Sequence, residues 1–299
     1  MENQSRKQRY ESRHGVFASF TEMVREIVEY RELLFQMTLR DVRIRYKQTV
    51  MGLGWAIFMP AMIIASGLLI KIIMAQMSGA KLEEAGAGSM MIKALPWSFF
   101  VGAISFATNS LTSNVGLVTK IYFPREVFPI SAMLAQCFDT MIGCIFLVPV
   151  LFWFLHVGVS MQFLWFLPLV LLLLMLTTGA GLLLSCANLF FRDVKYIVQV
   201  LITFGIFFTP VFYDAANLGP FGSKVLMLNP LAPIFEGLRL SIVDHHSLAR
   251  SLVVVAASGK EIVAWQPFYL LYSTIWAIIL FFGSWLLFHK LESIYAEYI

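Results

Sequence analysis

The stretch that decides the fold class is FLWFLPLVLLLLMLTTGAGLLLSCA, residues 163–187, in which no side chain is charged. An α-helix needs about 20 consecutive apolar residues to cross the hydrocarbon core of a bilayer. We therefore expect this segment to cross a membrane. Five other segments have the same character, and together they predict six transmembrane helices, at about 51–74, 95–118, 129–155, 163–187, 197–213 and 267–288.

The composition of the whole chain supports a membrane protein. Of its 299 residues, 59% are hydrophobic and only 13% are charged, whereas a soluble domain is nearer one half and one quarter. The net charge of +4 is small, and acidic residues are interleaved in the basic N-terminal arm, which argues against a nucleic-acid partner. Cys137, Cys144 and Cys186 lie in apolar runs and are expected to be small buried hydrophobes.

Lysine and arginine in the connections predict the orientation, because cytoplasmic loops are enriched in them. Ten of the 22 lie in residues 1–50. The connections expected on the same side carry Lys120, Arg125, Arg192, Lys195 and Lys290. The other side carries Lys81 and Lys93 in one loop, and four more spread along the connection 214–266. Both termini are therefore predicted to be cytoplasmic.

We divide the chain into a cytoplasmic arm, 1–50, and a single transmembrane domain, 51–299. Within the arm, residues 19–35 place apolar side chains on one helical face and acidic ones opposite. This pattern predicts an amphipathic helix at the membrane interface. A solvated helix packed on the spans is the alternative.

The connection 214–266 is too long for a turn. It contains apolar stretches at 221–229 and 231–243, separated by Asn229-Pro230, which are too short to span a bilayer. Such helices can enter the membrane from outside when protein or water covers their backbone. We expect a re-entrant gate hairpin at about 217–243, within an otherwise all-α polytopic fold.

Polar residues inside spans are candidates for function. Asp139 lies well inside the third span, where an ionised carboxylate is costly, and it shares a helical face with Gln136 and Thr140. It either lines a channel or forms a hydrogen bond between helices. The same two readings apply to a stripe in the second span, Ser105, Thr108, Asn109, Thr112 and Ser113.

Aromatic side chains and two charged loops allow similar alternatives. A set of rings could contact sugar faces or simply face lipid, namely Trp55, Phe58, Trp97, Phe99, Phe100 and Phe106. The loops 119–126 and 188–195 are either ordinary cytoplasmic loops or docking points for a partner protein.

No catalytic signature is present in the sequence. Gly259-Lys260-Glu261 lacks the rest of a phosphate-binding loop, so ATP is not expected to bind this chain. The adjacent pair His245-His246 is a poor metal site because neighbouring side chains diverge. We expect a non-catalytic protein without a metal or cofactor. A membrane-bound glycosyl- or acyltransferase is the enzyme alternative.

Several motifs occur together in a recognisable order. They are LRDVRIRY (39–46) with GLGW (52–55), FPRE (123–126) with Asp139, FFRDV (190–194), and TPVFY (209–213) with LNPL (228–231) and Arg239. In these motifs the sequence resembles the type-2 ABC exporter permeases that move O-antigen, teichoic-acid and capsular polysaccharides. An ABC permease for a drug, a peptide or a small lipid is the related alternative.

The resemblance implies a homodimer with two separate ATPase chains, which would hold the ATP and Mg²⁺, and an undecaprenyl-linked polysaccharide as substrate. It implies contacts with the ATPase at Glu22, Arg25, Glu29, Pro124, Arg125, Glu126, Arg192 and Asp193. The path for the glycan would be lined by Ser105, Asn109, Thr112, Asp139, Trp55, Phe58 and Phe106. A gate at the outer mouth would include Pro210, Tyr213, Asn229, Pro230 and Arg239.

Overall fold

The computed structural model describes residues 24–78, 85–118, 123–153, 158, 160–255 and 261–291. In this part of the chain five helices are long and apolar enough to cross a membrane. They are α4 (Gly54–Ser78), α5 (Ala85–Ser113), α7 (Val127–Trp153), α8 (Phe166–Phe190), which follows the 3₁₀ turn η1 (Met161–Trp165), and α12 (Pro267–Leu291). They coincide with five of the six predicted spans, so the multi-pass helical membrane fold is confirmed.

The predicted fifth span, 197–213, differs from the structure. Its helix is α9 (Val194–Gly205), extended by one 3₁₀ turn, η2 (Ile206–Phe208). At the usual rise per residue this rod is about 24 Å long, shorter than the ~30 Å of a bilayer core. The helix stops here because Pro210 has no backbone N–H and Val211 closes a tight turn onto the Thr209 carbonyl, at 2.7 Å.

The connection from α9 to α12 contains two short helices where the hairpin was predicted. After η3 (Ala215–Leu218), α10 (Gly219–Leu226) and α11 (Ala232–Ile242) are joined by a short turn. An antiparallel ribbon follows, β1 (Leu252–Val255) with β2 (Glu261–Trp265), which the sequence did not predict and which is a small addition to the predicted all-α fold. The apolar, β-branched residues of this ribbon form short runs, and such residues favour strands over helices.

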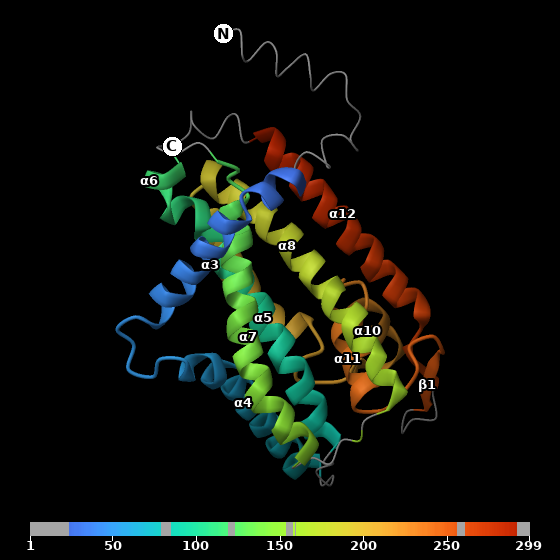
Figure 1. Ribbon diagram of the computed structural model, residues 1–299. Helices are drawn as coiled ribbons and strands as arrows, with labels where there is room; N and C mark the ends of the chain where they lie inside the picture. The colour runs from blue at the N-terminus through green and yellow to red at the C-terminus, as the bar shows by residue number, and fades with distance from the viewer. Residues whose placement is uncertain are drawn as a thin grey trace.

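The long helices pack closely, with α8 and α12 side by side (Figure 1). A Cβ on Gly179 of α8 would lie 2.6 Å from the carbonyl carbon of Leu280 in α12, so only glycine permits this approach. Two separate cores mark the two ends of the bundle. One joins Met37, Leu111, Phe128, Leu182 and Phe288, and we call this the α3 end. The other joins Trp97, Leu169, Phe235, Trp265 and Ala277, and we call this the hairpin end.

The N-terminal arm is helical for longer than the predicted 19–35. The chain is helical at residues 24–29 and, after a turn at Tyr30, continues as α3 (Arg31–Tyr46). Ile27 and Leu34 pack on the core of the α3 end, whereas Val24 and Val28 are 38% and 57% exposed. One part of the arm therefore packs on the spans and another presents apolar side chains outward, and the location of the arm at the membrane interface stays a prediction.

Helix α3 lies along α7 and runs in the same direction. Met37 shares a core with Phe128, Ser131 donates a hydrogen bond to Asp41, and Arg45 meets Asp139. The end of α3 therefore lies beside the middle of α7. The chain then continues through a loop, in which Gln48 and Gly52 have positive φ, into α4, which also runs in the direction of α7.

Candidate functional site

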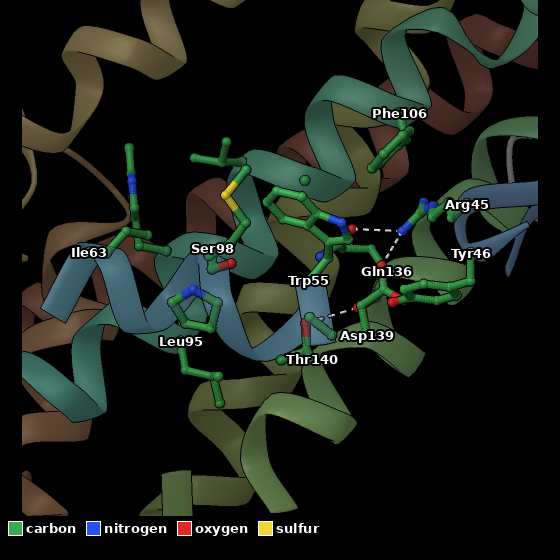
Figure 2. A pocket seen from close by; sticks show the side chains of 16 residues that line it. Arg45, Tyr46, Trp55, Ile63, Leu95, Ser98, Phe106, Gln136, Asp139 and Thr140 are labelled. Atoms are coloured by element: carbon green, nitrogen blue, oxygen red, sulfur yellow. Dashed lines mark hydrogen bonds and ion pairs between the residues drawn. The ribbon is translucent and has the colours of Figure 1, made fainter. Parts of the chain in front are cut away.

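A cavity of about 520 Å³ opens where α3, α4, α5 and α7 meet (Figure 2). Its polar wall comes from α3 and α7, and its aromatic wall comes from α4 and α5. The main polar and aromatic lining residues are Arg45, Tyr46, Trp55, Trp97, Ser98, Phe106, Gln136, Asp139 and Thr140.

An ion pair forms the polar wall. Arg45 Nη1 lies 2.5 Å from Asp139 Oδ2 and donates to Gln136 Oε1 at 2.9 Å. The Tyr46 hydroxyl donates to the other carboxylate oxygen of Asp139 at 2.5 Å. Asp139 therefore forms the hydrogen bonds between helices that one of the two readings predicted, and it also borders a cavity. Charged groups this well paired can remain in a membrane interior.

Close packing of α5 on α7 shapes the cavity. A Cβ on Gly102 would lie 2.5 Å from the side-chain amide of Gln136, so this glycine lets α7 bring its polar face against α5. The Arg45 guanidinium then lies over the Phe106 ring, with Cζ 3.6 Å from the centroid. Such stacking fixes the orientation of the guanidinium.

The aromatic wall is accessible. Trp55 and Phe106 are 43% and 45% exposed, and Trp55 packs edge-to-face on Phe58 with the ring centroids 5.5 Å apart. Such a site suits a ligand ring that has polar edges and an apolar face. The aromatic side chains can pack on its C–H groups, and the charged and amide side chains can form hydrogen bonds with its hydroxyls.

Of the seven predicted path residues, the structure brings Asp139, Trp55 and Phe106 together at the cavity. Phe58, Ser105, Asn109 and Thr112 are not among its lining residues. In the polar stripe of α5, Thr112 and the backbone of Thr108 accept hydrogen bonds from Asn188 of α8. Packing between helices is what the structure shows for this part of the stripe.

The residues predicted to contact an ATPase lie at or near the α3 end. Arg25, Glu29, Arg192 and Asp193 are exposed, whereas Glu22 lies outside the described residues. Pro124 is buried and Arg125 is half-buried. Their role in coupling stays a prediction.

Glu126 differs from its neighbours because it is only 2% exposed and packs inside the chain. Its Oε1 lies 3.4 Å from Nδ1 of His289 near the end of α12, and its Oε2 has no hydrogen-bond partner among the described residues. The 123–126 motif is thus tied to the last helix.

The predicted gate residues connect the end of α9 with the α10–α11 hairpin. The Tyr213 hydroxyl donates to the Phe207 carbonyl at 2.6 Å. Asn229 donates to the Phe208 carbonyl at 3.0 Å, and Ser273 of α12 donates to the carbonyl of Pro230 at 2.8 Å. Pro210 is buried beside this turn. Their function as a gate is not tested by these contacts.

Arg239 belongs to a group of charged residues, with Lys93 and Glu236 fully buried, that sequence reasoning missed. Lys93 was assigned to a loop, but it lies inside α5 and is 0% exposed, and its ammonium is 2.7 Å from Asp214. The placement was wrong because α5 begins at Ala85, ten residues before the predicted span. A lysine amid apolar residues at a predicted span boundary was the available signal.

Comparison with known proteins gives a consistent result. Residues 32–243 match the ABC-2 type transporter family. The chain is similar to an O-antigen export system permease protein RfbA of Myxococcus xanthus, with 24% identity over 246 residues that cover 81% of this chain and 92% of that protein. Two proteins of the same name from Klebsiella pneumoniae are 32% and 29% identical, and each match covers 67% of this chain and 76% of the relative.

Proposed function

The chain belongs to the ABC-2 type transporter family, and we propose that it is the permease subunit that exports an undecaprenyl-linked, O-antigen-like polysaccharide across the bacterial inner membrane. A separate ATPase chain, which holds ATP and Mg²⁺, would drive it. The observation that carries the proposal is the cavity, in which Trp55 and Phe106 face the Arg45–Asp139 pair. The pair offers donors and acceptors with no net charge, which suits the hydroxyls of a glycan.

We propose six crossings with both termini in the cytoplasm. Helix α8 ends at the α3 end and α12 begins at the hairpin end, so the segment between them has to pass from one end to the other (Figure 1). The short α9 would cover part of this distance, and the re-entrant hairpin would cover the rest. The basic residues of the arm support a cytoplasmic α3 end.

We propose that α9 faces a second copy of the chain across the glycan path. Its Gln199 and Thr203 are exposed and bond each other at 3.5 Å. Lipid offers such polar groups no hydrogen bonds, so a water-filled path between two subunits suits this face better.

The ATPase would dock at the α3 end, on Arg25, Glu29, Arg192 and Asp193. ATP can move this chain only if the ATPase contacts two of its states differently. Because Glu126 contacts His289, a movement of the 123–126 loop caused by the ATPase would also move α12. The double variant Arg125→Ala/Glu126→Gln should therefore hydrolyse ATP without export while the complex still assembles, and full export in that variant would remove the coupling role.

The function is tested by deleting the gene and locating the polymer. Export predicts polysaccharide that accumulates on the cytoplasmic face and disappears from the surface, and restoration by the wild-type gene. Absence of polymer in both places would favour a glycosyl- or acyltransferase. Unchanged surface polymer with altered resistance or export of a small molecule would favour a permease for a drug, a peptide or a small lipid.

A further inference from the structure

Five charged side chains connect the α10–α11 hairpin with α5, and we call them the hairpin charge cluster. They are Lys93, Asp214, Glu236, Arg239 and Asp244. Lys93 is contributed by α5, Asp214 follows the end of α9, and the other three lie in α11 or just after it. Lys93 and Glu236 are both 0% exposed, so neither charge is solvated from outside.

Helix α5 binds the chain after α9 through two adjacent turns. Lys93 Nζ donates to Asp214 Oδ1 at 2.7 Å and to the Tyr213 carbonyl at 2.9 Å. Ser89, one turn earlier, donates to the same carboxylate oxygen at 2.6 Å. The Asp214 carboxylate is therefore held by two donors from one face of α5.

Arg239 gathers the carboxylates on the other side. It lies 2.6 Å from Glu236 Oε1, 2.5 Å from Asp244 Oδ2 and 3.4 Å from Asp214 Oδ1. Three carboxylates face two cations, and Glu236 Oε2 has no hydrogen-bond donor among the described residues. The ammonium of Lys93 is 3.9 Å from that oxygen. Lys93 therefore compensates a buried charge of the hairpin from a different helix.

The same face of α5 also reaches the cavity. Trp97, one turn after Lys93, lines the cavity and packs edge-to-face on Phe235 of α11, with ring centroids 6.3 Å apart. The hairpin thus rests on α5 at two points one turn apart. One point is ionic, and the other belongs to the wall that the proposed glycan would touch.

We propose that Lys93 is the positioning residue that holds the α10–α11 hairpin closed over the outer end of the glycan path. The inference rests on the proposed function, because it takes the hairpin to be the outer gate. A buried ion that loses its partner strongly destabilises the arrangement that buries it. Without Lys93, Asp214 and Glu236 favour any state in which the hairpin moves away from α5 and water reaches them.

The test is leakage through the assembled permease–ATPase complex in liposomes loaded with a small fluorescent anion, without ATP. Lys93→Met keeps the length of the side chain and removes its charge, and it should raise the leak at least about tenfold. Lys93→Met/Glu236→Gln restores the original charge balance and should return the leak to within about threefold of wild type. Lys224→Met, an exposed lysine of α10, is the matched control and should not leak.

A Lys93→Met complex that is monodisperse and as tight as wild type overturns the proposal, and so does a double variant that leaks as much as the single one. If Lys93→Met does not assemble, Asp214→Asn decides. It removes the charge of the nearest partner of Lys93, at 2.7 Å, with little change of shape, so leakage supports the proposal and a tight vesicle overturns it. Wild-type complex that exports no glycan would instead remove the proposed function, which the leak assay does not measure.

Discussion

The molecule buries opposite charges in two places, and their surroundings differ. Arg45 and Asp139 border a cavity and each keeps 12% of its side chain exposed. Lys93 and Glu236 of the hairpin charge cluster are fully enclosed. A pair beside a cavity can exchange hydrogen bonds with a ligand, whereas the enclosed Lys93 and Glu236 respond only when helices move. The first should therefore govern export and the second the closed structure.

The largest effect is expected for Arg239→Ala, because Arg239 contacts all three carboxylates of the hairpin charge cluster and Glu236 among them is fully enclosed. Removing one partner of a buried ion pair costs about 3–5 kcal/mol. The Tm of the detergent-purified protein, followed by tryptophan fluorescence, should fall on the order of 10 °C. The control is Arg250→Ala, which changes an exposed arginine. A Tm of Arg239→Ala within about 2 °C of wild type would contradict the idea that the hairpin charge cluster stabilises the closed structure.

The second effect is expected at the cavity. Asp139→Asn keeps the shape of the side chain but replaces a charge-assisted bond to Arg45, which costs about 1–3 kcal/mol. Stability should fall less than for Arg239→Ala, while surface polysaccharide per cell should drop about tenfold. Glu32→Gln, an exposed carboxylate of α3, serves as control. Normal export by Asp139→Asn would leave the pair with a structural role alone.

These two variants also separate what the sequence predicts from what it does not. Asp139 stands out because a carboxylate in an apolar span is costly. Its partner Arg45 is 94 positions away in the sequence, on a helix that composition assigns to a cytoplasmic arm. Hydrophobicity gives no register between two helices, so the pairing, the cavity and the place of Lys93 become visible only in the fold.

The spans show the same limit. Five of them follow from apolar length alone, because length and composition are what a bilayer requires. The remaining segment, the predicted fifth span 197–213, is equally apolar. Its helix is shortened by the tight turn at Thr209-Pro210 and by the hydrogen bonds of Tyr213 and Asn229. Such contacts depend on residues brought together by folding, so hydropathy overestimates the length of α9.

A smaller effect is expected on the aromatic wall. Trp55→Ala removes an exposed ring, so stability should hardly change, whereas a lost ring contact of about 0.5–1.5 kcal/mol lowers export roughly threefold to tenfold. Trp276→Ala is a close match, because Trp276 on α12 is 44% exposed, Trp55 is 43% exposed, and Trp276 does not line the cavity. Equal losses of export in the two variants would show that the ring contributes through general membrane packing.

The smallest effect is expected for Asn109→Ala, and it tests whether the polar stripe of α5 belongs to the path. In the part of the chain that the structure describes, Asn109 Nδ2 donates to the Ser105 carbonyl of its own helix, at 2.8 Å, and to no other group. Asn188, which is 1% exposed, donates to Thr108 and Thr112 of the neighbouring helix and accepts from the Lys195 amide.

Asn188→Ala leaves buried groups unpaired and should cost about 1–3 kcal/mol of stability. Asn109→Ala should leave Tm nearly unchanged and export within about twofold of wild type, because it breaks no hydrogen bond between helices among the described residues. The measurement is surface polysaccharide beside thermal unfolding for both variants. If Asn109→Ala instead reduces export as much as Trp55→Ala while its Tm is unchanged, the glycan reaches this face of α5, and the path extends beyond the cavity toward the α3 end.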